Sequence, residues 1–96
     1  MKDNERAIAD LDIAIKLDPK NAVAYDSRGF AKFEIGDYKG AITNYDRAIE
    51  LNPKNVAAYS SRGIAKSHIG DYEGVSADYN IVVQLTSKNT DHYKES

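Results

Sequence analysis

Side chains that could support acid–base or metal chemistry are few in this chain of 96 residues. It has no Cys, which excludes disulfides, zinc fingers and thiol catalysis, and its two His are His68 and His92. His68 follows Glu34 by 34 residues, and neighbouring packed helices would hold the two about 10 Å apart. That separation is too long for a direct hydrogen bond between an acid and a base. We therefore expect a non-catalytic protein with no metal and no cofactor.

The charge balance limits the kinds of partner. Lys and Arg number 13 against 15 Asp and Glu, a net charge of −2, whereas a general nucleic-acid binder would be clearly basic. The hydrophobic fraction of 42% is enough for a core, but no apolar run approaches the roughly 20 residues of a membrane span. The N-terminus is too charged for a signal peptide. We expect a cytoplasmic protein that binds neither nucleic acid nor membranes.

The elements that position these side chains form a repeat. Every Gly, Pro and Tyr lies on one period of 34 residues, and aligning residues 22–55 with 56–89 gives 16 identities in 34 positions. A fixed period of this length indicates a repeat architecture. The sequence therefore predicts a half repeat at 1–21, full repeats at 22–55 and 56–89, and the start of a further unit at 90–96.

Each full repeat reads as two helices. Asn21 can cap the first helix and Gly36 can end it, because Gly readily adopts the left-handed conformation. Asp37 can cap the second helix, which should end at Asn52-Pro53 because Pro disfavours helical geometry in the residue before it. The next repeat has the same signals at Asn55, Gly70 and Asp71, and we expect its second helix to end at Thr86-Ser87. The half repeat supplies one helix from about Asn4 to Leu17.

This pattern resembles the tetratricopeptide repeat (TPR) family. The residues that carry the resemblance, besides the period, are Tyr25, Tyr59, Gly29 and Gly63 in the first helices and Ala41, Tyr45, Ala48 and Pro53 in the second. The resemblance covers the whole chain. It implies an all-α fold, a right-handed superhelix of antiparallel helix pairs with about two and a half repeats, forming a single domain over residues 1–96.

The resemblance also implies a function. TPR domains are protein-interaction modules that hold a peptide or partner segment in a concave groove lined by the first helices. The expected groove residues are Val23, Asp26, Ser27, Phe30, Phe33, Glu34, Ala57, Ser60, Ser61, Ile64, Ser67 and His68. Chaperone-binding members use a clamp of Lys, Asn and Arg on these helices, and none of those residue types occupies the corresponding positions here. We therefore do not expect binding of acidic C-terminal peptides in that mode.

Arg28 and Arg62 replace a common Leu of the family. We expect them to make structural contacts between helices, with Asp10 or Asn44 as the partner of Arg28 and Asn44 or Asp78 as the partner of Arg62.

The two ends of the array suggest an alternative function. The first helix lacks a partner before it and the last segment lacks one after it, so the chain could be a fragment or could self-associate as a dimer or head-to-tail oligomer. The candidate residues for self-association are Ile8, Leu11, Ile13, Ile15, Ile81 and Tyr93.

Overall fold

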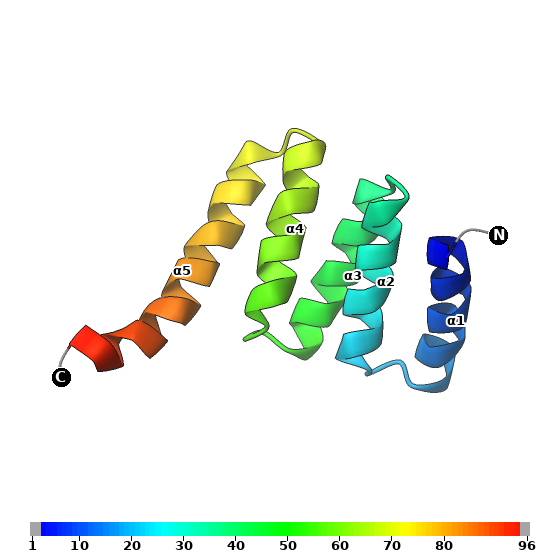
Figure 1. The fold of residues 1–96 in the computed structure, drawn as a ribbon, viewed down its shortest axis with the longest axis horizontal. Helices are drawn as coiled ribbons and strands as arrows, with labels where there is room; N and C mark the ends of the chain where they lie inside the picture. Colours follow the sequence, from blue (N-terminus) through cyan, green and yellow to red (C-terminus); the bar gives the residue numbers. More distant parts are fainter. Residues whose placement is uncertain (1–2, 95–96) are drawn as a thin grey trace.

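The computed structural model describes the backbone of residues 3–94 and the side chains of residues 3–87, and this part of the chain is all-α, as predicted (Figure 1). Successive helices run antiparallel and stack into an elongated molecule of 52 × 31 × 20 Å. None of the described helices combines the length and apolar character needed to cross a membrane. The helices are α1 (Asp3–Leu17), α2 (Ala22–Glu34), α3 (Tyr38–Leu51), α4 (Val56–His68) and α5 (Tyr72–Lys94).

The first helices of the two repeats begin and end where the sequence predicts. The side chains of Asn21 and Asn55 each accept a hydrogen bond of 3.1 Å from the backbone N–H three residues on, which caps α2 and α4. Both helices are followed by a glycine with positive φ, 85° at Gly36 and 79° at Gly70. This backbone conformation is strained for other residues, so it explains why glycine recurs there.

The second helices are capped by the predicted aspartates. Asp37 accepts a 3.0 Å hydrogen bond from the N–H of Gly40, and Asp71 accepts an equivalent bond from Gly74. A Cβ atom at position 40 would collide with the carboxylate of Asp37. A larger residue at position 40 would therefore require the Asp37 carboxylate to shift from the place that it occupies in the cap.

Helix α5 differs from the prediction. It was expected to end at Thr86-Ser87, but it continues without interruption to Lys94, so the segment from Thr90 that we expected to start a new helix prolongs α5 instead. Asn52-Pro53 stops α3 at this point of the repeat, whereas Ser87 keeps the backbone N–H that Pro lacks. The hydroxyl of Thr86 donates to the carbonyl of Val82 at 2.8 Å, one turn back in the same helix.

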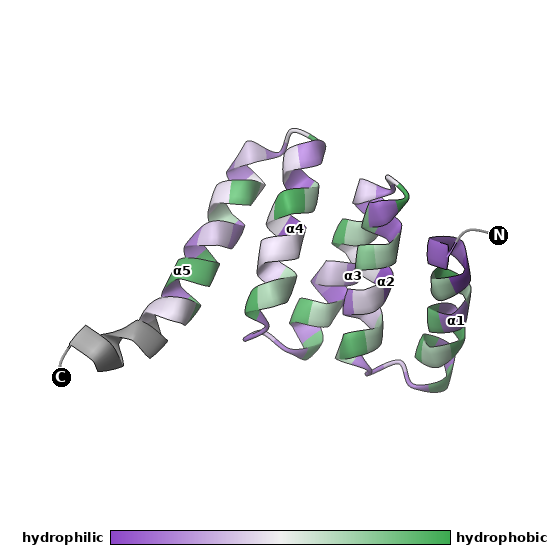
Figure 2. Cartoon of the chain, in the orientation of Figure 1, coloured by the Kyte–Doolittle hydropathy of each residue, from purple (hydrophilic) through white to green (hydrophobic). Residues whose placement is uncertain are grey.

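The core is built from small residues and two tyrosines. Its buried hydrophobic residues are Ala24, Ala31, Ala41, Tyr45, Ala48, Ala58, Tyr59 and Ala65, all from α2, α3 and α4. Tyr45 packs directly on Gly29, where an added Cβ would lie only 2.8 Å from the ring atom Cε1. Figure 2 shows apolar residues alternating with polar ones along the helices, as expected where each helix is covered on one side.

The packing of the described helices defines two layers. Helices α2 and α4 contact each other, whereas α1, α3 and α5 contact only these first helices and the pairs α1–α3 and α3–α5 do not touch. The stack is therefore tighter on the side of α2 and α4, which makes them the inner layer of the curve.

Candidate functional site

A hollow lies between the two inner helices. It has a volume of about 70 Å³ and is lined by Phe30, Phe33, Ser61, Ile64 and Tyr45. The first four are predicted groove residues from α2 and α4, and the packing brings them together. Tyr45 comes from α3 and reaches between the inner helices to form part of the lining. It was not among the predicted groove residues, because its recurrence as Tyr79 one period on indicates a scaffold position.

The lining keeps large apolar side chains in contact with water. Phe30 is 56% exposed and Ile64 is 43% exposed, while Phe33 is half-buried. Val23 is also well exposed at the start of α2. The hollow therefore combines apolar walls with access from solvent, which is the common character of a binding site.

The other predicted groove residues surround the hollow with different degrees of exposure. Ser67 is half-buried, and its hydroxyl donates to the carbonyl of Ile64 at 2.6 Å, so it is paired within α4. The remaining positions offer polar or charged side chains, except for Ala57. Ser27, Glu34, Ala57 and His68 are exposed, and Asp26 and Ser60 are half-buried.

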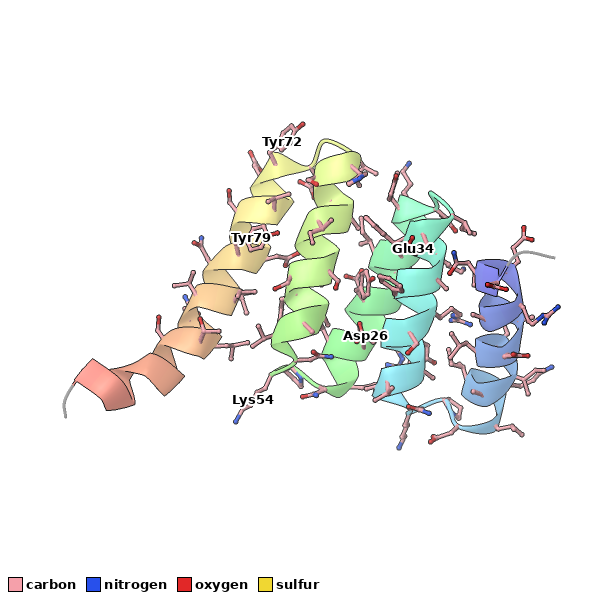
Figure 3. The ribbon with its side chains drawn as sticks, in the orientation of Figure 1. Asp26, Glu34, Lys54, Tyr72 and Tyr79 are labelled. Atoms are coloured by element: carbon pink, nitrogen blue, oxygen red, sulfur yellow. The ribbon has the colours of Figure 1, made fainter. Side chains whose placement is uncertain are left out.

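Two carboxylates give the groove its charge. Burial raises the pKa of Asp26 above its ordinary value. The pKa of Tyr45 is raised first by burial and further by the negative charges of Asp26 and Glu34, against the effect of a hydrogen bond with Ser61. Both carboxylates are therefore close enough to act on the lining of the hollow. Figure 3 shows them at different heights along α2.

His68 is exposed, and its ring also belongs to an aromatic cluster. Its ring centroid lies 5.2 Å from that of Phe33 and 4.5 Å from that of Tyr38, and the Phe33 and Tyr38 centroids are 5.3 Å apart. Tyr38 was not among the predicted site residues. The period of the sequence could have indicated this contact, because it places the end of α4, with His68, beside the end of α2 and the turn into α3.

Arg28 and Arg62 face the interior of the stack and make contacts between helices, as expected. Each binds one predicted partner, Asn44 for Arg28 and Asp78 for Arg62, and a second partner that was not predicted. Arg28 donates from Nε to Asn44 at 2.7 Å and from Nη1 to Asp12, not Asp10, at 2.8 Å. Each arginine bridges the second helix of its own repeat and the one before it, and residue 12 rather than 10 faces the guanidinium from that earlier helix.

Arg62 repeats this arrangement one period on. It donates to Asp78 at 2.6 Å and 3.1 Å, as predicted, and to Asp46 at 2.7 Å, whereas Asn44, the other predicted candidate, is bound by Arg28. Lys66 lies 3.2 Å from the same Asp78, a fully buried carboxylate that is thus held by two cations. These contacts fix helix spacing and lie outside the hollow.

The predicted self-association residues are spread over both ends of the stack. Ile13 on α1 is 59% exposed, whereas Ile8, Leu11, Ile15 and Ile81 are half-buried. The side chain of the sixth candidate, Tyr93, lies outside the described residues. Exposed Leu17 and Tyr79 were not predicted.

Within the described residues, no group of three or more His, Asp or Glu side chains is placed to hold a metal ion. The groove offers apolar contact and negative charge, and it has no nucleophile paired with a base.

Comparisons with known proteins agree with the fold. A family model described as TPR repeat matches residues 29–67. The crystal structure of MamA is similar over 94% of this chain, with a TM-score of 0.89 and 26% identity, and the chain spans about half of it, 53%. The Arabidopsis OM64 TPR domain has a TM-score of 0.82 and 30% identity, covering 85% of this chain and 68% of that domain.

A further similar structure contains a ligand. It is the second TPR of Spaghetti (RPAP3) bound to the HSP90 peptide SRMEEVD, with a TM-score of 0.82 and 29% identity over 85% of this chain and 76% of that one. No curated protein sequence matches the chain.

Proposed function

Because the chain belongs to the tetratricopeptide-repeat family, whose members are protein-interaction modules, we propose that it is a non-catalytic scaffold that binds a peptide or partner segment between α2 and α4. The observation that carries this proposal is the hollow, whose apolar residues Phe30 and Ile64 are each about half exposed to solvent. Each square ångström of apolar surface withdrawn from water contributes about 25 cal/mol, so a partner side chain seated there gains affinity.

The class of peptide should differ from that of the similar structure with a ligand. The second TPR of Spaghetti is bound to SRMEEVD, a peptide with three carboxylate side chains. Here the groove positions carry Asp26 and Glu34 and no Lys or Arg. An acidic peptide would meet like charge, which opposes binding. The groove is therefore expected to reject SRMEEVD.

Peptide display against the chain tests the proposal. Selected peptides are titrated by fluorescence polarisation against the parent chain, Phe30→Ala and Ile64→Ala. We expect each substitution to weaken binding about tenfold, the size of a buried anchor lost from an interface. Val83→Ala is the matched control, because Val83 is 59% exposed, close to the 56% of Phe30, but lies on α5, away from the hollow. Peptides that bind Phe30→Ala and Ile64→Ala as tightly as the parent would place the site elsewhere.

Self-assembly remains the second candidate function, and one comparison favours it. Tyr79 is 40% exposed on α5, whereas Tyr45, at the same place in the period, is 1% exposed because α4 covers it. Covering such a face with a second copy of the chain would bury apolar surface at both partners. Light scattering over a range of concentrations tests self-assembly. A dimer or larger species that is absent from the Tyr79→Ser variant supports it, and a parent chain that stays monomeric at high concentration excludes it.

A further inference from the structure

One stripe of α2 carries an ordered set of side chains. Asp26, Phe30, Phe33 and Glu34 follow each other at helical spacing, so they share a face of the helix. The two carboxylates are eight residues apart, which is about 12 Å along the axis at 1.5 Å per residue. The apolar hollow lies between them, because Phe30 and Phe33 form part of its wall. The site is thus an apolar hollow with a carboxylate at each end.

Neither carboxylate is neutralised by the fold. Among residues 3–87, the acidic partners in ion pairs are Asp12, Glu50, Asp46 and Asp78, and Asp26 and Glu34 are not among them. Three cations of the inner helices are directed elsewhere: Arg28, Arg62 and Lys66 bind groups on the second helices. The groove therefore presents unpaired negative charge on both sides of an apolar centre.

For Asp26, no interaction within the protein offsets the partial loss of hydration of its carboxylate. It is half-buried, and the only effect on its pKa is the rise caused by burial, with no cation or hydrogen bond acting in the opposite direction. A carboxylate that has lost part of its hydration regains stabilisation from a cation brought by a ligand. A cationic side chain at this end of the hollow therefore gains more than it would at a fully hydrated acid.

The spacing indicates the form of the ligand. In an extended chain the rise is about 3.3 Å per residue, and residues i−2, i and i+2 project on the same side. The outer two are then about 13 Å apart, close to the 12 Å between the carboxylates. We propose that the groove binds an extended peptide with an aliphatic side chain in the hollow and Lys or Arg two residues before and two after it. This inference rests on the proposed function and specifies its ligand.

A set of synthetic peptides tests the spacing and the charge. The probe is the labelled peptide Gly-Ser-Lys-Ser-Leu-Ser-Lys-Ser-Gly, titrated by fluorescence polarisation at low salt. Its isomer Gly-Ser-Ser-Lys-Leu-Lys-Ser-Ser-Gly has the same composition, but both lysines project away from the side of the leucine. We expect the isomer to bind about fivefold more weakly. Replacing both lysines with Glu, or the leucine with Ser, should weaken binding at least about tenfold.

Variants of the chain locate the charge contacts. Asp26→Asn and Glu34→Gln should each weaken binding of the lysine probe about three- to fivefold. Neither substitution should change the affinity for a peptide with Ser in place of both lysines. Glu73→Gln removes an exposed carboxylate on α5 and should change nothing. Raising the salt concentration should reduce the advantage of the lysine probe over the Ser peptide, since exposed charges are screened.

The outcomes separate this inference from the proposed function. If peptides selected by display need Phe30 but gain nothing from flanking lysines, the groove is a binding site and the inferred ligand is wrong. If the lysine probe binds equally to the parent and to Phe30→Ala, the binding is non-specific attraction to an acidic protein and does not occur in the hollow. Equal affinity for the probe and its isomer would overturn the extended geometry.

Discussion

Gly29 and Gly63 hold the same place in the repeat but meet different neighbours. A Cβ at Gly29 would lie 2.8 Å from a ring atom of buried Tyr45, whereas a Cβ at Gly63 would lie 3.5 Å from the ring of Tyr79, an ordinary contact. Packing against Tyr45 therefore favours glycine at position 29. At position 63 glycine lowers the stability of α4, and no close contact favours it there. The period alone makes these two positions look the same.

We therefore expect opposite effects from the same substitution. Gly63→Ala should raise the free energy of unfolding by up to about 1 kcal/mol, the difference in helix propensity between the two residues. Gly29→Ala gains the same propensity but must displace Tyr45, and overpacking costs about 1–3 kcal/mol, so the net effect should be a loss of about 1 kcal/mol. Urea unfolding of both variants measures this. Equal stabilisation by both would mean that the Tyr45 ring moves freely.

Asp26 predicts a pH dependence of stability. Burial raises its pKa in the folded state above the ordinary value of 3.8, so the folded chain binds this proton to higher pH than the unfolded chain does. The contribution of Asp26 to stability is therefore highest below pH 3.8 and is lost as the pH rises through the folded-state pKa. A carboxylate that lowers stability at neutral pH is consistent with a residue retained for binding.

Asp26→Asn should thus stabilise the chain at pH 7, and the gain should shrink as the pH falls towards 3.8, because both side chains are then uncharged. Urea unfolding at a series of pH values measures the difference between variant and parent. A loss of stability at pH 7, or a gain that is constant with pH, would contradict this account of Asp26.

At the scale of elements, local capping and breaking residues determine where three of the described helices end. The asparagine and aspartate caps and the positive-φ glycines act within three or four residues, and α2, α3 and α4 follow them closely. Helix α5 lacks the breaking residues and continues past the corresponding position. Where Asn-Pro stops α3, Thr86-Ser87 does not stop α5, and the helix runs to Lys94.

Restoring the stop should shorten α5. In the double variant Thr86→Asn and Ser87→Pro, the helix is expected to end near Leu85, because Pro cannot supply the N–H and disfavours helical geometry before it. Circular dichroism should show a loss of helix, and the backbone amides of residues 88–94 should exchange faster with solvent. Ser87→Ala, the control, should keep the parent signal. A double variant with the helix content of the parent would show that α5 is not limited by this position.

At the scale of the whole molecule, burial is uneven along the stack. Helix α3 contributes four buried residues and packs against both α2 and α4, whereas α1 contributes none. In a repeat protein each unit is stabilised mainly by its neighbours, so units with fewer neighbours open more readily. Apolar surface is accordingly exposed on α1 and α5, at Ile13 and Tyr79.

Hydrogen exchange should follow this gradient. We expect the amides of α3 and α4 to exchange most slowly, those of α2 next, and those of α1 much faster, because α1 can separate without disturbing the buried alanines and Tyr45. Exchange measured by mass spectrometry or NMR would test the order. A common rate for α1 and α3 would instead indicate that the stack opens as one cooperative unit.

The sequence predicted the candidate site in part. It predicted the apolar residues Phe30, Phe33 and Ile64 on the inner helices, because the period separates repeated scaffold positions from variable ones. It missed Tyr45 in the lining and Tyr38 beside His68. The position of the Tyr45 ring depends on its close packing against Gly29, and the position of the Tyr38 ring depends on the turn before α3. Neither position follows from the spacing of residues in the sequence.

By itself, the sequence determined the all-α class, the period, the capped helix ends and the family, because these depend on interactions within a few residues and on their repetition. Only the tertiary structure decided which of two equivalent residues is buried, that Arg28 binds Asp12, and that Phe30, Ile64 and Tyr45 line one hollow. The physical reason is that these properties depend on neighbours from other helices, 16 or more residues away, whose distance and rotation are fixed by packing.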